Sequence, residues 1–154
     1  MAFKSTGSDV SSSFITAAAA DPDGVSTAAA VGNNAALTLG GALASGGSVT
    51  FDSPRNVTIL SGGDDSAISF TVAGTDESGT AATESITGAD TGTATGTKFF
   101  ATITSITAVG DPAGNVSAGS GTSIAGVISA SRCRLRGIYV VNGSGAATLK
   151  FRAV

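Results

Sequence analysis

Short β-type runs separated by turn residues are the feature that most restricts the fold of this chain. From about residue 35, alternating apolar and polar residues are interrupted by Gly, Pro, Asn or Asp roughly every 8–12 residues, which is typical of an all-β sandwich or barrel. Ile68, Phe70 and Val72 share one face of such a run, while Ser69 and Thr71 share the other. The pattern predicts antiparallel strands joined by short turns.

The expected strands occupy residues 37–39, 48–51, 56–60, 68–72, 83–87 and 99–109. In the last of these runs the apolar residues change parity between Ile103 and Ile106, which predicts a bulge or a bend. Residues 21–24, Asp-Pro-Asp-Gly, form a strong turn signal. We interpret residues 119–121, Gly-Ser-Gly, as a short linker.

The chain of 154 residues is long enough for one domain with its own core. We expect an extended N-terminal arm over residues 1–13 and a single antiparallel β-sandwich, Ig-like or jelly-roll-like, over residues 14–118. Residues 119–154 are expected to form a basic C-terminal hairpin, because Asn142-Gly143 favours the positive φ angles of a tight turn.

The composition points to a protein that gains stability from its neighbours. Charged residues make up 12% of the chain, and its 42% of apolar residues are mostly Ala and Val, which bury little area each. Burial against other subunits adds to a modest core of this kind. No apolar run approaches the roughly 20 residues that span a bilayer, and residues 1–10 lack a secretion signal, so we expect no membrane partner.

Charge is distributed unevenly along the chain. Residues 1–111 contain all eleven acidic residues and three basic ones, a net charge of −8, whereas residues 112–154 contain five basic residues and no acid. The basic end is therefore expected to contact an acidic surface, of its own body or of a neighbour. Direct nucleic-acid binding is disfavoured by the acidic body and the absence of interleaved aromatics. The candidate partner-contact residues are Arg132, Arg134, Arg136, Lys150, Arg152 and Lys4.

The arginines at 132, 134 and 136 share one face of the expected strand, with Cys133 and Leu135 on the other. Two interpretations stay open: a solvated edge strand protected by its charge, or a contact between subunits.

Groups for catalysis are scarce in this sequence. Histidine is absent, Cys133 is the single cysteine, and no nucleophile or phosphate-binding motif occurs. We therefore expect no enzyme, no cofactor and no metal. Three acidic pairs are weak calcium candidates, and we favour turn residues that bond their own backbone. These pairs are Asp21 with Asp23, Asp64 with Asp65, and Asp76 with Glu77.

A series of motifs lies within residues 42–119, a stretch of about half of the chain: PRNVTI, GDD, FTVAGTD, ESITG and FFATITSI. With these motifs, the stretch from Ala42 to Gly119 resembles a β domain that recurs among structural proteins of tailed bacteriophages. The resemblance implies a virion structural protein and supplies no catalytic residue.

The function expected from this resemblance is a capsid decoration or cement protein on the outer surface of the phage head. Its partners are then the major capsid protein and further copies of this chain, as trimers or dimers. The alternative is a tail, fibre or head–tail connector component that contacts the host surface. Tyr139 is the chain's one Tyr or Trp, which disfavours a glycan site.

Overall fold

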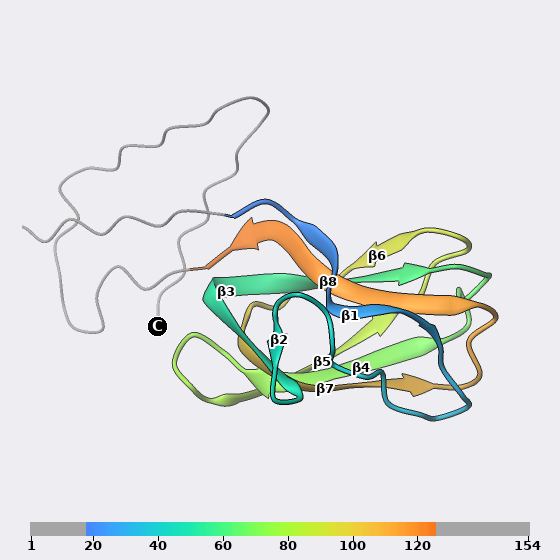
Figure 1. Cartoon of the computed structure of the whole chain (residues 1–154), viewed down its shortest axis with the longest axis horizontal. Helices are drawn as coiled ribbons and strands as arrows, with labels where there is room; N and C mark the ends of the chain where they lie inside the picture. Colours follow the sequence, from blue (N-terminus) through green and yellow to red (C-terminus); the bar gives the residue numbers. More distant parts are fainter. Residues whose placement is uncertain (1–17, 126–154) are drawn as a thin grey trace, which may run out of the picture.

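The computed structural model describes residues 18–125, which form eight β-strands and, within that range, no helix (Figure 1). The strands form one antiparallel sheet in the order β1-β8-β3-β7-β4-β5, with β2 and β6 also paired to β3. This arrangement confirms the predicted all-β, sandwich-like fold. The strands are β1 (Asp21–Ala30), β2 (Ala44–Ser45), β3 (Ser48–Ser61), β4 (Ser69–Thr75), β5 (Ala81–Thr87), β6 (Thr93–Thr95), β7 (Phe100–Val109) and β8 (Asn115–Ile124).

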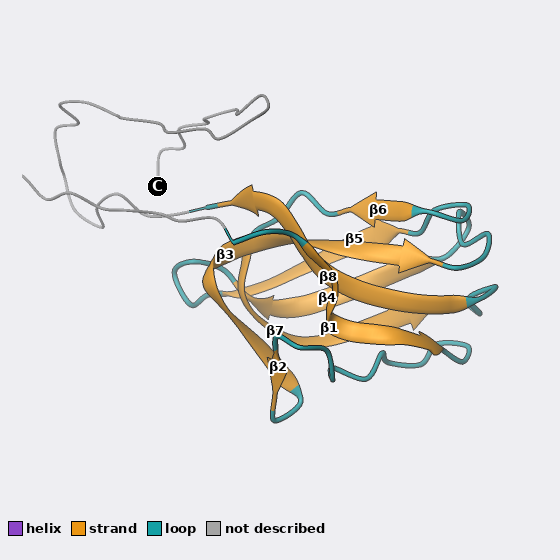
Figure 2. Cartoon of the chain, turned by 45° about the horizontal axis from the view of Figure 1, so that its top comes forward, coloured by secondary structure: helices purple, strands orange, loops and turns teal. Residues whose placement is uncertain are grey.

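Strand β3 belongs to both layers of the fold. Its first part pairs with β7, and its second part, from Val57 to Ser61, pairs with β8. The register shifts on both sides of Arg55, so the strand bends there and passes from one layer to the other (Figure 2). The two strands expected at 48–51 and 56–60 are therefore one. Pro54 lies at the bend, one of the few places where a strand tolerates a residue without an N–H.

The core lies between the two layers. In β4, Phe70 and Val72 are fully buried, as the alternating pattern predicts, and they pair with Ala108 and Ile106 of β7. Each apolar side chain buried in this way stabilises the fold by roughly 1.5–3 kcal/mol. The buried apolar residues are Val25, Leu37, Val49, Phe51, Val57, Ile59, Phe70, Val72, Ile86, Phe100, Ile103, Ile106, Ala108, Val116 and Ala118.

The predicted irregularity in β7 is a bulge at Thr104. Ala73 of β4 pairs with Ser105 and Gly74 pairs with Ile103, which leaves Thr104 without a partner residue. The Thr104 hydroxyl donates to the carbonyl of Ala73 at 3.2 Å. The extra residue turns both Ile103 and Ile106 into the core, which explains the change in apolar parity.

Three expectations are wrong. Residues 21–24 do not form a turn but begin β1, an edge strand in which Pro22 is tolerated because an edge has unpaired N–H positions. Residues 119–121 are not a linker but lie inside β8, where they are buried, so the β domain continues past residue 118. Residues 37–39 do not form a strand: Ala36 makes an isolated bridge to Thr107.

The expected N-terminal arm, residues 1–13, lies outside the described residues. The same holds for the expected C-terminal hairpin from residue 126 onward, including Cys133, Tyr139 and the Asn142-Gly143 turn.

Candidate functional site

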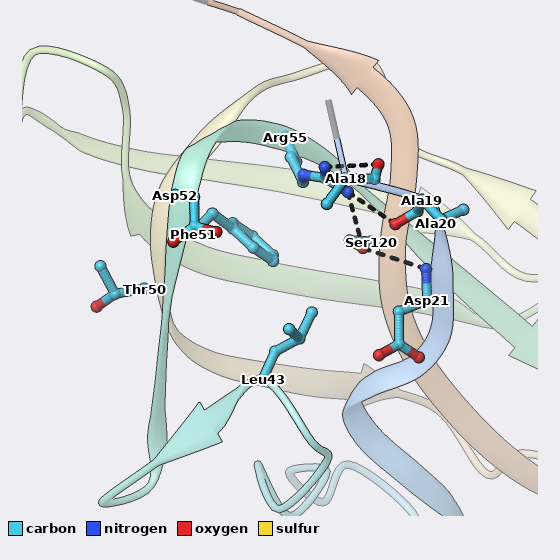
Figure 3. A pocket seen from close by; sticks show the side chains of 10 residues that line it. All are labelled: Ala18, Ala19, Ala20, Asp21, Leu43, Thr50, Phe51, Asp52, Arg55 and Ser120. Atoms are coloured by element: carbon cyan, nitrogen blue, oxygen red, sulfur yellow. Dashed lines mark hydrogen bonds between the residues drawn. The ribbon is translucent and has the colours of Figure 1, made fainter. Parts of the chain in front are cut away.

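Pro54 and Arg55, at the bend of β3, hold both ends of the described body. The amide of Ala125, just after β8, donates to the Pro54 carbonyl at 2.9 Å. The Arg55 guanidinium donates from Nη2 to the Ala18 carbonyl at 2.7 Å and from Nη1 to the Ala19 carbonyl at 3.1 Å (Figure 3). The segments before residue 18 and after residue 125 therefore join the body at the same place.

Arg55 also contacts the end of β8. Its Nη1 donates to the Ser120 hydroxyl at 3.4 Å and to the Gly121 carbonyl at 3.5 Å, both longer than an optimal bond. The Ser120 hydroxyl accepts a further bond, from the Asp21 amide, at 3.3 Å. These contacts connect the start of β1, the end of β8 and the bend of β3.

Arg55 as a residue is 5% exposed, yet no carboxylate pairs with its guanidinium within residues 18–125. A buried charge without a counter-ion is costly unless hydrogen bonds compensate for it. Here carbonyl and hydroxyl oxygens take that role, and the planar fork of arginine binds several of them at once. Lysine, with one nitrogen, does not reproduce this arrangement.

A pocket of about 370 Å³ opens beside Arg55 (Figure 3). Phe51 and Leu43 reach into it from different sides, and Leu43 is 39% exposed. Asp21 and Asp52 also line the pocket, and neither carboxylate has a hydrogen-bond partner within the described residues. The pocket thus presents apolar surface, two carboxylates without a hydrogen-bond partner among the described residues, and the buried cation Arg55 in the same lining. Its lining is Ala18, Ala19, Ala20, Asp21, Leu43, Thr50, Phe51, Asp52, Arg55 and Ser120.

The candidate partner-contact residues predicted from the sequence lie outside the described residues, so their positions stay a prediction. They are Lys4, Arg132, Arg134, Arg136, Lys150 and Arg152. Residues 18–125 contain ten acidic residues and two basic ones, a net charge of −8. Since Arg55 is buried, Lys98 is the exposed cation of this described range. The described body therefore has an acidic surface.

Two of the acidic pairs contain turn residues, as expected. The Asp64 carboxylate accepts from the hydroxyl and the amide of Ser66 at 2.6 and 3.1 Å, and these bonds lower the pKa of Asp64. The Asp76 carboxylate accepts from the amides of Ser78 and Thr80 at 2.8 and 2.9 Å. Asp21 and Asp23 lie in β1 instead, so the turn interpretation is wrong for that pair.

Asp65, next to Asp64, is fully buried. Its Oδ1 accepts from the amide of Ala113 at 2.7 Å, whereas its Oδ2 has no hydrogen-bond partner. Through the bond to Ala113, Asp65 connects the β3–β4 turn to the β7–β8 turn.

Residues 18–125 contain no group of three or more His, Cys, Asp or Glu side chains that could hold a metal ion.

A second pocket, of about 430 Å³, lies at the edge strand β5. Lys98 Nζ donates to the Thr83 carbonyl at 2.7 Å, and the Glu84 carboxylate accepts from the amides of Thr97 and Lys98. The segment before β7 thereby covers part of the β5 edge and limits strand addition there.

The role of Arg55 was not predicted from the sequence. It is a single arginine in a run otherwise made of apolar and small polar residues, directly after a proline, and this pattern does not distinguish a buried arginine from an exposed one. Its partners are 36 to 66 residues away along the chain, so local patterns do not identify them.

Comparisons with protein-family models, with curated proteins and with solved structures find no match to this chain. In the part of the chain that the structure describes, no helix is long and apolar enough to cross a membrane.

Proposed function

We propose that this protein is a structural protein of a virus particle, a decoration or cement protein on the outer surface of the head of a tailed bacteriophage. Its copies, as trimers or dimers, bridge neighbouring major capsid subunits. The strand motifs from Ala42 to Gly119, which resemble a β domain of phage virion proteins, support this proposal. So does the modest core, which gains stability when further surface is buried.

The observation that carries the proposal is the joining of both terminal segments at Pro54 and Arg55. Two segments that leave one end of a rigid body side by side can contact two neighbouring subunits at one junction. The basic residues after residue 125 add charge for a contact with an acidic partner surface. The rest of the body then faces away from the lattice.

Binding of this kind stabilises the capsid by mass action. A protein that binds the assembled lattice and not the free capsid subunits lowers the free energy of the assembled state. Each contact can be weak, because a multimer that holds several lattice sites gains from the high effective concentration of its remaining contacts.

The test is the number of copies of this protein per purified particle, from quantitative mass spectrometry against the major capsid protein. A count close to that of the capsid protein supports a position on the head lattice. A count of a few copies supports the tail, fibre or connector role and refutes decoration. Absence from the particle refutes both.

A further inference from the structure

We propose that the pocket beside Arg55 binds the basic C-terminal segment, residues 126–154, of the same chain, with the stretch from Arg132 to Arg136 lying across it. This inference concerns the isolated chain and does not depend on the proposed function. It assigns a ligand to a pocket in which two carboxylates have no hydrogen-bond partner among residues 18–125 and the apolar side chain of Leu43 is exposed.

Charge complementarity selects this segment. The pocket is lined by the carboxylates of Asp21 and Asp52 and by the buried cation Arg55, and the described body has a net charge of −8. Residues 126–154 contain five basic residues and no acidic one. Residues 1–17 are the other chain segment attached at this end, and they have no net charge, with one lysine and one aspartate. A pocket with two carboxylates and one buried cation, on a strongly acidic body, therefore favours the C-terminal segment.

The apolar part of the pocket fits the same stretch. Leu43 is 39% exposed, whereas most large apolar side chains within residues 18–125 are buried, and Phe51 lines the same pocket. Cys133 and Leu135 alternate with the three arginines in the sequence. The stretch therefore supplies small apolar groups for the pocket and cations for its carboxylates, and arginine stems add apolar contact of their own.

The attachment of the chain favours its own segment over that of a second copy. The Ala125 amide is bonded to Pro54, next to the pocket residue Arg55. Arg132 lies seven positions after Ala125, and seven residue steps extend to at most about 25 Å, which is enough to return to the pocket. A tether this short gives an effective concentration of about 1 mM, above that of a second copy in dilute solution.

Cys133 provides the probe, because it is the single cysteine of the chain. In the full-length Leu43→Cys variant, mild oxidation with copper phenanthroline should form a disulfide between positions 43 and 133 within one chain. Such a bond requires the two Cα atoms to come within about 7 Å. Peptide mapping and gel mobility without reductant identify the bond and show whether it joins one chain or two.

Leu60→Cys is the matched control. Leu60 is 37% exposed, close to the value for Leu43. It lies near the C-terminal end of β3, five residues after Arg55, where it pairs with Thr93 and Ser117. We expect the intramolecular disulfide to form at least about tenfold faster in the Leu43→Cys variant than in the control. Ala20→Cys, also in the pocket lining, serves as a second probe if Leu43→Cys does not fold.

Two further variants test the charges. With Leu43→Cys in place, replacing the three arginines at 132, 134 and 136 by glutamate should slow the bond at least about tenfold. The double substitution Asp21→Asn and Asp52→Asn should slow the bond by a similar factor. A salt concentration of 1 M should also slow it, because it shortens the electrostatic screening length to about 3 Å. Equal rates at positions 43 and 60, or rates that do not respond to these changes, overturn the inference. Disulfide-linked dimers in place of closed monomers overturn it in favour of a neighbouring copy as the ligand.

Discussion

Replacing Arg55 by alanine removes the side chain that connects residues 18 and 19 to the bend of β3 and to the end of β8. The two short bonds, at 2.7 and 3.1 Å, come from a charged donor. Bonds of this kind contribute about 1.5–3 kcal/mol each. The lower value applies here because the accepting carbonyls belong to exposed residues that water can reach. The expected loss in the free energy of unfolding is therefore about 3 kcal/mol.

Arg55→Met is the informative companion variant. Methionine keeps much of the side-chain volume and does not bury a charge, and replacing a buried charge by an apolar group of similar size is often nearly neutral. We expect Arg55→Met to lose about 1 kcal/mol, less than the alanine variant. Both variants release residues 18 and 19, so hydrogen exchange at the Asp21 amide, which is bonded to Ser120, should accelerate at least about tenfold in each.

Urea unfolding followed by circular dichroism measures the stability, since the chain has no tryptophan for fluorescence. With a slope of about 1.5 kcal/mol per molar urea, the alanine variant should unfold at a midpoint about 2 M lower than the unmodified protein. A loss below about 0.5 kcal/mol with unchanged exchange at Asp21 would show that the Arg55 contacts do not hold the end of the body.

Three other substitutions test separate features of the fold. Gly74→Ala should lower the free energy of unfolding by about 3 kcal/mol in urea, because a Cβ there overlaps the Thr102 carbonyl opposite the bulge, whereas Gly40→Ala, with no contact closer than 3.8 Å, should be nearly neutral. Asp65→Ala should lower the free energy of unfolding by about 1–3 kcal/mol, since it leaves the Ala113 amide in the β7–β8 turn unpaired. Asp65→Asn keeps an oxygen acceptor for that amide and should cost less; equal losses would contradict this account. The pKa of Asp64 lies below its ordinary 3.8, so the contribution of Asp64 to stability is complete above pH 3.8 and is lost as the pH falls through the lower folded-state value. Ser66→Ala removes the hydroxyl that donates to Asp64, and an NMR titration should show that the pKa of Asp64 rises in this variant.

The local patterns of the sequence were sufficient for one half of the fold. The alternation at Phe70 and Val72 located the β4–β5 hairpin, and the change in parity between Ile103 and Ile106 located the bulge of β7. Both features depend on neighbours along one strand or across one turn. Such features follow from the two-residue repeat of a strand, which a single sequence displays directly.

The features that the sequence did not reveal depend on distant partners. Residues 21–24 have the composition of a turn, but they extend because β8, nearly a hundred residues later, offers them an edge to pair with. Arg55 is buried because two distant segments, residues 18–19 and residues 120–121, bring their oxygens to it. The predicted contact residues from Arg132 to Arg152 lie outside the described part of the chain, so that interpretation stays a prediction.

The joining of both ends at Pro54 and Arg55 has a mechanical consequence. If the two terminal segments are held by different partners and pulled apart, the tension enters at Ala18 and Ala125 and passes first through a few bonds around the bend of β3. Once those bonds yield, antiparallel β1 and β8 are loaded from the same end and separate one pair at a time, the weaker direction for a ladder. The Arg55 contacts therefore set the force at which the body begins to open, while the core between β4 and β7 stays unloaded.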